Sequence, residues 1–261
     1  MHARCRPFSS LTVAGTVSKC SRRDVNAAWE AASPRRHHDT AGAWPISLGE
    51  TIRAASTGAS VIGQVVADGA SPGKAALRRT LLNARAQLPP ASRVAGAGVV
   101  CRTLADLPPV ASAQSVLGYA AFGSELVIDA LLETLLARGT AVHLPWVDGD
   151  QLQVARVADL AKDLTPGWRG VREPATDRRR PVAAAIMDVV VAPGVGFDRN
   201  GRRLGYGGGH FDRLLARLRP GAVVVGVAFD EQMVDMVPTE AHDRTVDLVV
   251  TPTLVTHVAK R

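Results

Sequence analysis

The pattern of apolar and polar residues predicts two helices at the start of the well-patterned part of the chain. Leucines recur at helical spacing over residues 74–88, and Ser71-Pro72 before them has the form of a helix cap followed by a first-turn proline. The leucines of this stripe are Leu77, Leu81, Leu82 and Leu88. Pro89-Pro90 then ends the first helix, and a second helix is expected over residues 92–104.

Beyond residue 104, short apolar runs alternate with amphipathic segments. Residues 128–138 carry a helical stripe closed by Gly139, and residues 211–218 are also expected to be helical. The polar, turn-rich stretch 165–180 predicts a loop. Strands are expected at residues 115–120, 140–144, 151–157, 187–192, 222–229 and 246–251. This alternation predicts an α/β fold: a single domain with a mainly parallel sheet flanked by helices on both faces.

Residues 1–70 have a different character. They are rich in Ser, Ala, Gly and Arg and show neither a helical nor a strand period. A leader of this composition can be an organelle-targeting peptide, but the acidic residues Asp24, Glu30, Asp39 and Glu50 argue against that interpretation. We expect an N-terminal extension over residues 1–70 that is disordered or results from a start codon assigned too early. The folded domain is expected over residues 71–261.

Composition narrows the class of protein. Hydrophobic residues make up 46% and charged residues 21% of the chain, as in a globular protein with a core, and no apolar run is long enough to span a bilayer. The net charge of +7 is spread over scattered arginines, which favours a solvated surface, or a pocket for acidic small molecules, over nucleic-acid binding. Cys5, Cys20 and Cys101 show no metal-binding spacing, so we expect no disulfide framework and a cytoplasmic location.

A glycine-rich segment from Pro193 to Asp212 follows the continuous apolar run 187–192 and leads into a helix that begins near His210. Glycine backbone can approach a ligand closely, a helix start exposes free N–H groups, and ligands bind beyond the carboxyl ends of parallel strands. Together these features predict a phosphate-binding loop, although a purely structural turn has the same pattern. The segment is neither a Walker A loop nor a dinucleotide fingerprint, whose third glycine position is occupied by His210.

Charged residues near this segment have candidate roles. Asp212 lies in the first turn of the following helix and Asp243 precedes the last strand, so both are candidate Mg²⁺ ligands. Asp212 could equally cap its helix, and Asp243 could pair with Arg244. Lys74 and Arg78 are four residues apart on one helix face and could bind phosphate, or they could form a solvated basic face.

These motifs together resemble those of the 5-formyltetrahydrofolate cyclo-ligases, also called methenyltetrahydrofolate synthetases. The signature runs Pro-Gly-Val-Gly-Phe-Asp-x-x-Gly-x-Arg-Leu-Gly-Tyr-Gly-Gly-Gly-x-x-Asp-Arg and ends at Arg213. Three shorter pieces resemble the family in the same order, namely Lys74-x-x-x-Arg78, Phe122-Gly-Ser-Glu125 and His242-Asp243. The resemblance covers about residues 73–255 and implies a single α/β domain.

The resemblance also implies a reaction and its participants. ATP phosphorylates the formyl oxygen of 5-formyltetrahydrofolate, N10 attacks the activated carbon, and 5,10-methenyltetrahydrofolate, ADP and phosphate are released. The implied partners are ATP, Mg²⁺ and a small-molecule folate, without nucleic acid or membrane, in a monomer or weak homo-oligomer. Because the substrate supplies its own nucleophiles, the protein needs no Ser, Cys or His nucleophile and acts by positioning and by neutralising charge.

Roles for individual residues follow from the same resemblance, by position. The implied nucleotide-binding residues are Lys74, Arg78, Arg203, Gly205, Tyr206, Gly207, Gly208, Gly209, His210 and Phe211. The implied folate-binding residues are Ala120, Glu125, Tyr206 and His210, and the implied catalytic residues are Arg203, Tyr206 and His210. Asp212 and Asp243 are the implied Mg²⁺ ligands.

Two positions depart from the family pattern, and other functions remain open. His210-Phe211 stands where many members carry Tyr-Tyr, and Trp146 stands where a basic residue is commoner. Another α/β enzyme that acts on phosphorylated small molecules, such as a sugar-phosphate isomerase or a CoA-transferase relative, is the first alternative. A non-catalytic nucleic-acid-binding module, suggested by the high isoelectric point, is the second.

Overall fold

The computed structural model describes residues 73–259. The expected N-terminal extension and the Ser71-Pro72 helix opening lie outside the described residues. The first helix, α2 (Lys74–Gln87), agrees with the leucine stripe. The second helix, α3 (Pro90–Asp106), is longer than expected at both ends, because Pro90 is accepted in a helix's first turn, where no N–H is needed. A short helix, α4 (Pro108–Ala111), follows it.

A seven-stranded sheet forms the centre of the domain. Its strand order is β12-β11-β9-β6-β1-β2-β3, in which the five strands from β11 to β2 are parallel and the two outer strands are antiparallel to their neighbours. The strands are β1 (Ser115–Leu117), β2 (Ala141–Asp148), β3 (Gln151–Val157), β6 (Val189–Pro193), β9 (Val223–Val227), β11 (Leu248–Val250) and β12 (Val255–His257). The predicted mainly parallel sheet is therefore confirmed, whereas β12 was not predicted.

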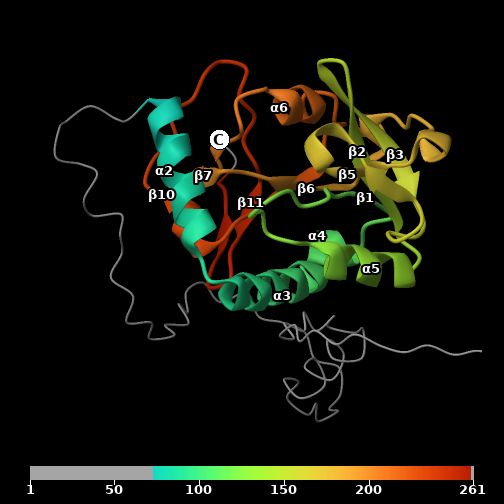
Figure 1. Cartoon of the computed structure of the whole chain (residues 1–261), viewed down its shortest axis with the longest axis horizontal. Helices are drawn as coiled ribbons and strands as arrows, with labels where there is room; N and C mark the ends of the chain where they lie inside the picture. Colours follow the sequence, from blue (N-terminus) through green and yellow to red (C-terminus); the bar gives the residue numbers. More distant parts are fainter. Residues whose placement is uncertain (1–72, 260–261) are drawn as a thin grey trace, which may run out of the picture. The chain divides into compact units, whose positions relative to one another are not determined.

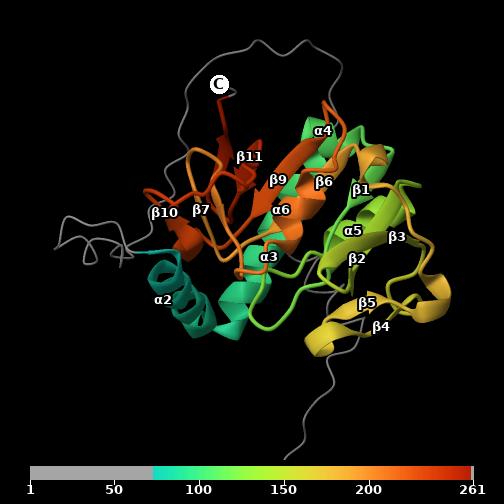
Figure 2. The same ribbon diagram turned by 90° about the horizontal axis from the view of Figure 1, so that it is seen from above.

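Helices cover both faces of this sheet, as the sequence predicted (Figures 1 and 2). Helices α3 and α5 (Asp129–Ala137) pack on one face, and α6 (His210–Leu215) packs on the other. The continuous apolar run of β6 explains this arrangement, because successive side chains of a strand point to opposite faces. Val189 and Val191 join the core under α3 and α5, and Val190 and Ala192 join the core under α6.

A second, three-stranded sheet places α2 beside the glycine-rich segment. Its order is β10-β7-β8, from β7 (Gly196–Asp198), β8 (Arg203–Leu204) and β10 (Met233–Val234). Leu77 and Leu81 of α2 pack there against Val195, Leu204 and Val237, in a small core of their own. A Cβ on Gly196 would lie 2.4 Å from Leu81 Cδ1, so the close approach of α2 requires glycine at this position.

The prediction of a loop over residues 165–180 is wrong in part. This stretch contains a hairpin of β4 (Leu164–Pro166) and β5 (Arg172–Pro174), joined by the 3-10 turn η2 (Trp168–Gly170). Strands this short carry no readable alternation of apolar and polar residues, so turn composition dominated the prediction. Three further 3-10 turns are η3 (Thr176–Arg178), η4 (Ala184–Ile186) and η5 (Asp230–Gln232).

Several predicted boundaries also shift. β1 ends at Leu117 rather than at residue 120, α6 ends at Leu215 rather than at residue 218, and β2 continues to Asp148. The residues after β1 leave the sheet and line the cleft described below. Among residues 73–259, none of the helices has both the length and the apolar character needed to cross a membrane.

Candidate functional site

One cleft of about 760 Å³ brings the sequence-predicted residues together. It opens beyond the carboxyl ends of β1 and β6, the edge at which open α/β sheets bind ligands. All of the predicted nucleotide, folate and metal residues line it: Lys74, Arg78, Ala120, Glu125, Arg203, Gly205, Tyr206, Gly207, Gly208, Gly209, His210, Phe211, Asp212 and Asp243. They come from segments more than a hundred residues apart in the sequence.

The glycine-rich loop forms one side of the cleft. Gly207 and Gly209 adopt positive φ angles of 106° and 63°, a conformation that favours glycine. A Cβ on Gly207 would lie 3.5 Å from the guanidinium carbon of Arg78, so the backbone of the loop lies directly against a basic side chain of α2. Arg78 Nε also donates to the Gly205 carbonyl at 2.7 Å and holds the loop to the helix.

Arg203 lies behind this loop as a buried cation. Its Nη2 donates to Asp212 Oδ1 at 2.9 Å and its Nη1 donates to the Pro193 carbonyl at 3.3 Å. Its guanidinium carbon lies 5.5 Å from the centroid of the Phe211 ring. Arg203 Nε is buried and has no hydrogen-bond partner among the described residues.

A cluster of two carboxylates and one imidazole near the N-terminal end of α2 offers donors that could bind a metal ion. Ligand atoms of Glu240, His242 and Asp243 lie within 4.8 Å of one another. Lys74 Nζ lies 2.7 Å from Asp243 Oδ2 and 3.2 Å from Glu240 Oε1. Burial opposes the ionisation of both Lys74 and Asp243, but the hydrogen bonds and charges around them together outweigh it. Asp243 and Glu240 raise the pKa of Lys74, and Lys74 with the Glu240 N–H lowers the pKa of Asp243.

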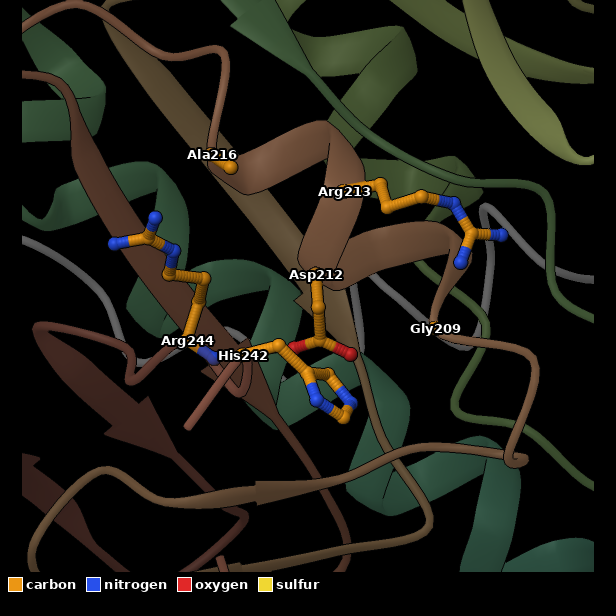
Figure 3. A pocket seen from close by; sticks show the side chains of 6 residues that line it. All are labelled: Gly209, Asp212, Arg213, Ala216, His242 and Arg244. Atoms are coloured by element: carbon orange, nitrogen blue, oxygen red, sulfur yellow. Dashed lines mark hydrogen bonds between the residues drawn. The ribbon is translucent and has the colours of Figure 1, made fainter. Parts of the chain in front are cut away.

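Asp212, the other predicted metal ligand, has different neighbours. Its Oδ1 accepts from Arg203 Nη2 and, at 3.2 Å, from the Arg244 backbone N–H. It also lines a smaller pocket of about 440 Å³ together with His242, and Figure 3 shows both side chains at that pocket. The structure thus brings His242 to both predicted metal ligands. Carboxylate oxygens are hard donors that fit Mg²⁺, whereas the imidazole is the donor that suits Mg²⁺ least.

Glu125 is a nearly buried carboxylate in the cleft, with 9% of its surface exposed. Its Oε2 accepts from the Phe122 backbone N–H at 2.9 Å, and its carboxylate is hydrogen-bonded to the Tyr206 hydroxyl. Burial raises the pKa of Glu125, against the opposing effects of the Phe122 N–H, Tyr206 and Arg85. Burial, together with the nearby Glu125 charge, likewise raises the pKa of Tyr206 to about 12, so its phenol stays protonated at neutral pH.

The aromatic side chain of the β4–β5 hairpin, Trp168, was missed by the sequence analysis. Trp168 at the hairpin tip is 49% exposed, and its ring centroid lies 6.5 Å from that of His210. Asp129 fixes the hairpin through Arg172, whose Nη2 lies 2.9 and 2.8 Å from the two carboxylate oxygens. A tryptophan in a polar, turn-rich stretch was the available signal, because such a ring is seldom left exposed without a partner.

The sequence analysis also missed Arg85 and Glu240, and it noted Trp146 only as a departure from the family pattern. Trp146 lines the cleft from β2, and the Arg179 guanidinium lies 5.8 Å from its ring centroid. Glu240 precedes the His242-Asp243 pair by two residues, and no strand or helix pattern marks it. Arg85 could have been found, because it falls on the same helical face as Lys74 and Arg78.

Comparison with known proteins identifies the family to which the chain belongs. The 5-formyltetrahydrofolate cyclo-ligase family matches residues 70–252. The chain is similar to a 5-formyltetrahydrofolate cyclo-ligase of Mycolicibacterium smegmatis, with 33% identity over 69% of this chain and 93% of the relative. It is similar to the protein of the same name from Escherichia coli K12, with 33% identity over 57% of this chain and 83% of the relative.

Two solved structures have the same fold. A 5,10-methenyltetrahydrofolate synthetase of Aquifex aeolicus matches with a TM-score of 0.64 and 31% identity, over 72% of this chain and 94% of that one. A 5,10-methenyltetrahydrofolate synthetase of Mycoplasma pneumoniae matches with a TM-score of 0.57 and 21% identity, over 69% of this chain and 99% of that one. At that identity, the second match is evidence of the fold alone.

Proposed function

Because the chain belongs to the 5-formyltetrahydrofolate cyclo-ligase family, we propose that it converts 5-formyltetrahydrofolate to 5,10-methenyltetrahydrofolate with ATP and Mg²⁺, releasing ADP and phosphate. The observation that carries the proposal is that every residue assigned to nucleotide, folate or metal lines one cleft. The partner is a small-molecule folate, in keeping with a cleft whose lining mixes basic, acidic and aromatic side chains. We further propose that the enzyme acts in the cytoplasm as a monomer or weak homo-oligomer.

The chemistry requires activation of a poor electrophile. The formyl group on N5 is an amide, so its oxygen first takes the terminal phosphoryl group of ATP, and the P–O bond to ADP breaks. N10 then forms a bond to the formyl carbon, the bond from that carbon to the phosphorylated oxygen breaks, and phosphate leaves with the former formyl oxygen. The N10 proton is lost to solvent. The five-membered ring closes without a nucleophile from the protein.

The nucleotide half of the cleft supplies charge and shape. Lys74 and Arg78 project from α2 toward the glycine-rich loop, where they would neutralise phosphate oxygens while loop N–H groups donate to them. Arg203, held by Asp212 at the lining of the cleft, would add positive charge near the transferred group. Positioning of reactants by such groups can lower a barrier by roughly 7–11 kcal/mol.

The metal fits the carboxylates at the end of α2. Asp243 and Glu240 would hold Mg²⁺, and Asp212, which lines the same cleft, would be a further carboxylate for it. When bound, the ion neutralises negative charge on the phosphates of the nucleotide. Lys74, now paired with Asp243 and Glu240, would then exchange those partners for phosphate oxygens.

The folate half of the cleft offers a carboxylate and aromatic faces. Glu125 would accept N–H bonds from the aminopyrimidinone edge of the pterin, a contact that needs the ionised form. Trp168 and His210 line the cleft with tilted rings whose centroids are 6.5 Å apart, and their faces would contact a planar ligand, while Tyr206 would present its ring and hydroxyl beside Glu125.

A spectrophotometric assay tests the proposed function. Purified protein is mixed with 5-formyltetrahydrofolate, and the growth of methenyltetrahydrofolate absorbance is followed with ATP plus Mg²⁺, with ATP plus a chelator, and without ATP. The proposal expects product only in the first mixture. Absence of product there, from folded protein, contradicts it.

A further inference from the structure

Arg85 is a buried cation that lies behind the cleft rather than in its lining. Only 3% of its surface is exposed, although its guanidinium carries a permanent charge. Burying such a charge is costly unless it is fully hydrogen-bonded, so a buried arginine calls for a reason beyond packing.

The guanidinium joins three segments that surround the cleft. Nε donates to Ser124 Oγ at 3.0 Å, Nη1 reaches the Gly194 carbonyl at 3.5 Å, and Nη2 donates to the Tyr206 hydroxyl at 2.6 Å. Its central carbon also lies 5.8 Å from the Tyr206 ring centroid. Gly194 begins the segment after β6, Ser124 belongs to the turn that carries Glu125, and Tyr206 belongs to the glycine-rich loop.

The chemistry of these groups fixes the direction of one hydroxyl. A guanidinium can only donate hydrogen bonds, so the Tyr206 oxygen must act as the acceptor toward Arg85. The single O–H of Tyr206 is therefore free to donate to Glu125, to which it is hydrogen-bonded. Hydrogen bonds in such a series polarise one another, which strengthens the donor at the carboxylate.

Helix geometry explains why Arg85 serves the folate half of the cleft. Lys74, Arg78 and Arg85 are spaced by four and seven residues, and at about 100° per residue they form one stripe along α2. Lys74 and Arg78 lie at the metal and nucleotide end, where they contact Asp243 and Gly205. Arg85, about three turns later, reaches the Glu125 end of the same cleft.

We propose that Arg85 is a positioning residue that aligns Tyr206 and the Glu125 turn for folate, while tying both to the segment that begins the nucleotide loop. The inference rests on the proposed function and deepens it, because it names the residue that sets the folate-binding geometry. Arg85 does not touch the reactants. It acts through Tyr206, Ser124 and Gly194.

A merely structural role for Arg85 makes a different prediction. If the guanidinium only fastened α2 to the domain, its loss would lower thermal stability and would weaken ATP and folate binding alike. A positioning role predicts a selective rise in the KM for 5-formyltetrahydrofolate, because two of the three contacts, Ser124 and Tyr206, adjoin Glu125 in the folate half of the cleft.

The experiment compares Arg85→Met with Arg79→Met, an exposed arginine of the same helix, as matched control. Arg85→Met is expected to raise the folate KM roughly 10- to 100-fold, the effect of losing hydrogen bonds to a charged group. The ATP KM should change less than threefold, Arg85→Lys should recover part of the loss, and Arg79→Met should behave as the unaltered protein. An unchanged folate KM, or equal rises in both KM values, overturns the proposal.

A double-mutant cycle with Tyr206→Phe tests the series of hydrogen bonds directly. If Arg85 acts through the Tyr206 hydroxyl, the effects of the two substitutions on the folate KM will not add, whereas independent effects overturn this route. If Arg85→Met does not fold, Tyr206→Phe alone must raise the folate KM, and no rise overturns the proposal. Failure of the proposed function can be told apart from failure of the Arg85 proposal. In the first case the unaltered protein forms no methenyltetrahydrofolate, and both proposals lose their basis.

Discussion

The Lys74 ammonium lies 2.7 Å from Asp243 Oδ2, so a residue assigned to phosphate and a residue assigned to metal are ion-paired with each other. Glu240 at 3.2 Å is a second partner of Lys74. Under the proposed function, binding of nucleotide and metal would replace this pair by two others, Lys74 with phosphate and Asp243 with the ion. Because each charge would again have a partner, the cost of desolvation would be limited.

Asp243→Asn should lower turnover about 100-fold and raise the Mg²⁺ concentration needed for half-maximal activity, since a neutral amide is a weaker ligand than a carboxylate. A magnesium titration of the initial rate measures both quantities. Asp177→Asn, whose side chain is 79% exposed, is the control and should follow the unaltered curve. A normal magnesium curve for Asp243→Asn would remove Asp243 from the metal site.

Lys74→Ala should raise the KM for ATP about tenfold or more, with a smaller effect on the KM for folate, because the lost charge faces the glycine-rich loop. Initial rates over a grid of both substrates separate the two constants. Lys162→Ala removes a surface lysine that pairs only with Asp159 among the described residues, and it should change neither constant. An effect confined to folate would place the nucleotide elsewhere.

Gly207→Ala should weaken ATP binding, because its φ of 106° is strained for any residue with a Cβ. The strain costs about 1–2 kcal/mol, and the added methyl group would face Arg78. Gly139→Ala is the matched control, since Gly139 has a φ of 82° and no atom within 4 Å of the added Cβ. Both substitutions should lower Tm, but only Gly207→Ala should raise the KM for ATP.

Glu125→Gln should raise the folate KM and remove the acid limb of its pH profile. Burial raises the pKa of Glu125 above its ordinary value of 4.5, so folate affinity in the unaltered protein falls as pH drops through that raised pKa. Arg85, the Tyr206 and Tyr119 hydroxyls and the Phe122 N–H are the charged and polar groups around this carboxylate.

Glu125→Gln should weaken folate binding, but it should not lower the stability of the folded protein. A carboxylate with a raised pKa destabilises the folded protein above that pKa, so the substitution should leave Tm at pH 7 unchanged or higher. The pH dependence of folate KM from pH 5 to 8, together with thermal unfolding, checks both expectations. An acid limb that persists in Glu125→Gln would assign it to another group.

Much of the fold followed from periodicity. The run Val189–Pro193 and the stripes of α2 and α5 were readable because each element buries a face whose spacing is set by its own geometry. The β4–β5 hairpin and the small sheet of β7, β8 and β10 were not readable, because two- and three-residue strands have no period. Their positions depend on tertiary contacts such as Leu81 against Gly196.

The residues predicted for the site share one cleft, but not all of their pairings were predicted. The glycine spacing and the family motifs identified residues that share one cleft, whereas local sequence could not indicate that Asp212 would pair with Arg203 or that Lys74 would pair with Asp243. Arg85 was missed because a lone arginine in a helix resembles a solvated one. Contacts with Ser124, Gly194 and Tyr206, all distant in the sequence, surround its guanidinium.

The transfer of oxygen tests the central claim most directly. 5-Formyltetrahydrofolate labelled with ¹⁸O in the formyl group is converted with ATP and Mg²⁺, and the released phosphate is analysed by mass spectrometry. If the formyl oxygen accepts the phosphoryl group, each methenyltetrahydrofolate formed will be matched by one phosphate that carries the label. Unlabelled phosphate alongside methenyltetrahydrofolate would contradict the account, because ATP would then have been hydrolysed by water and not by the folate.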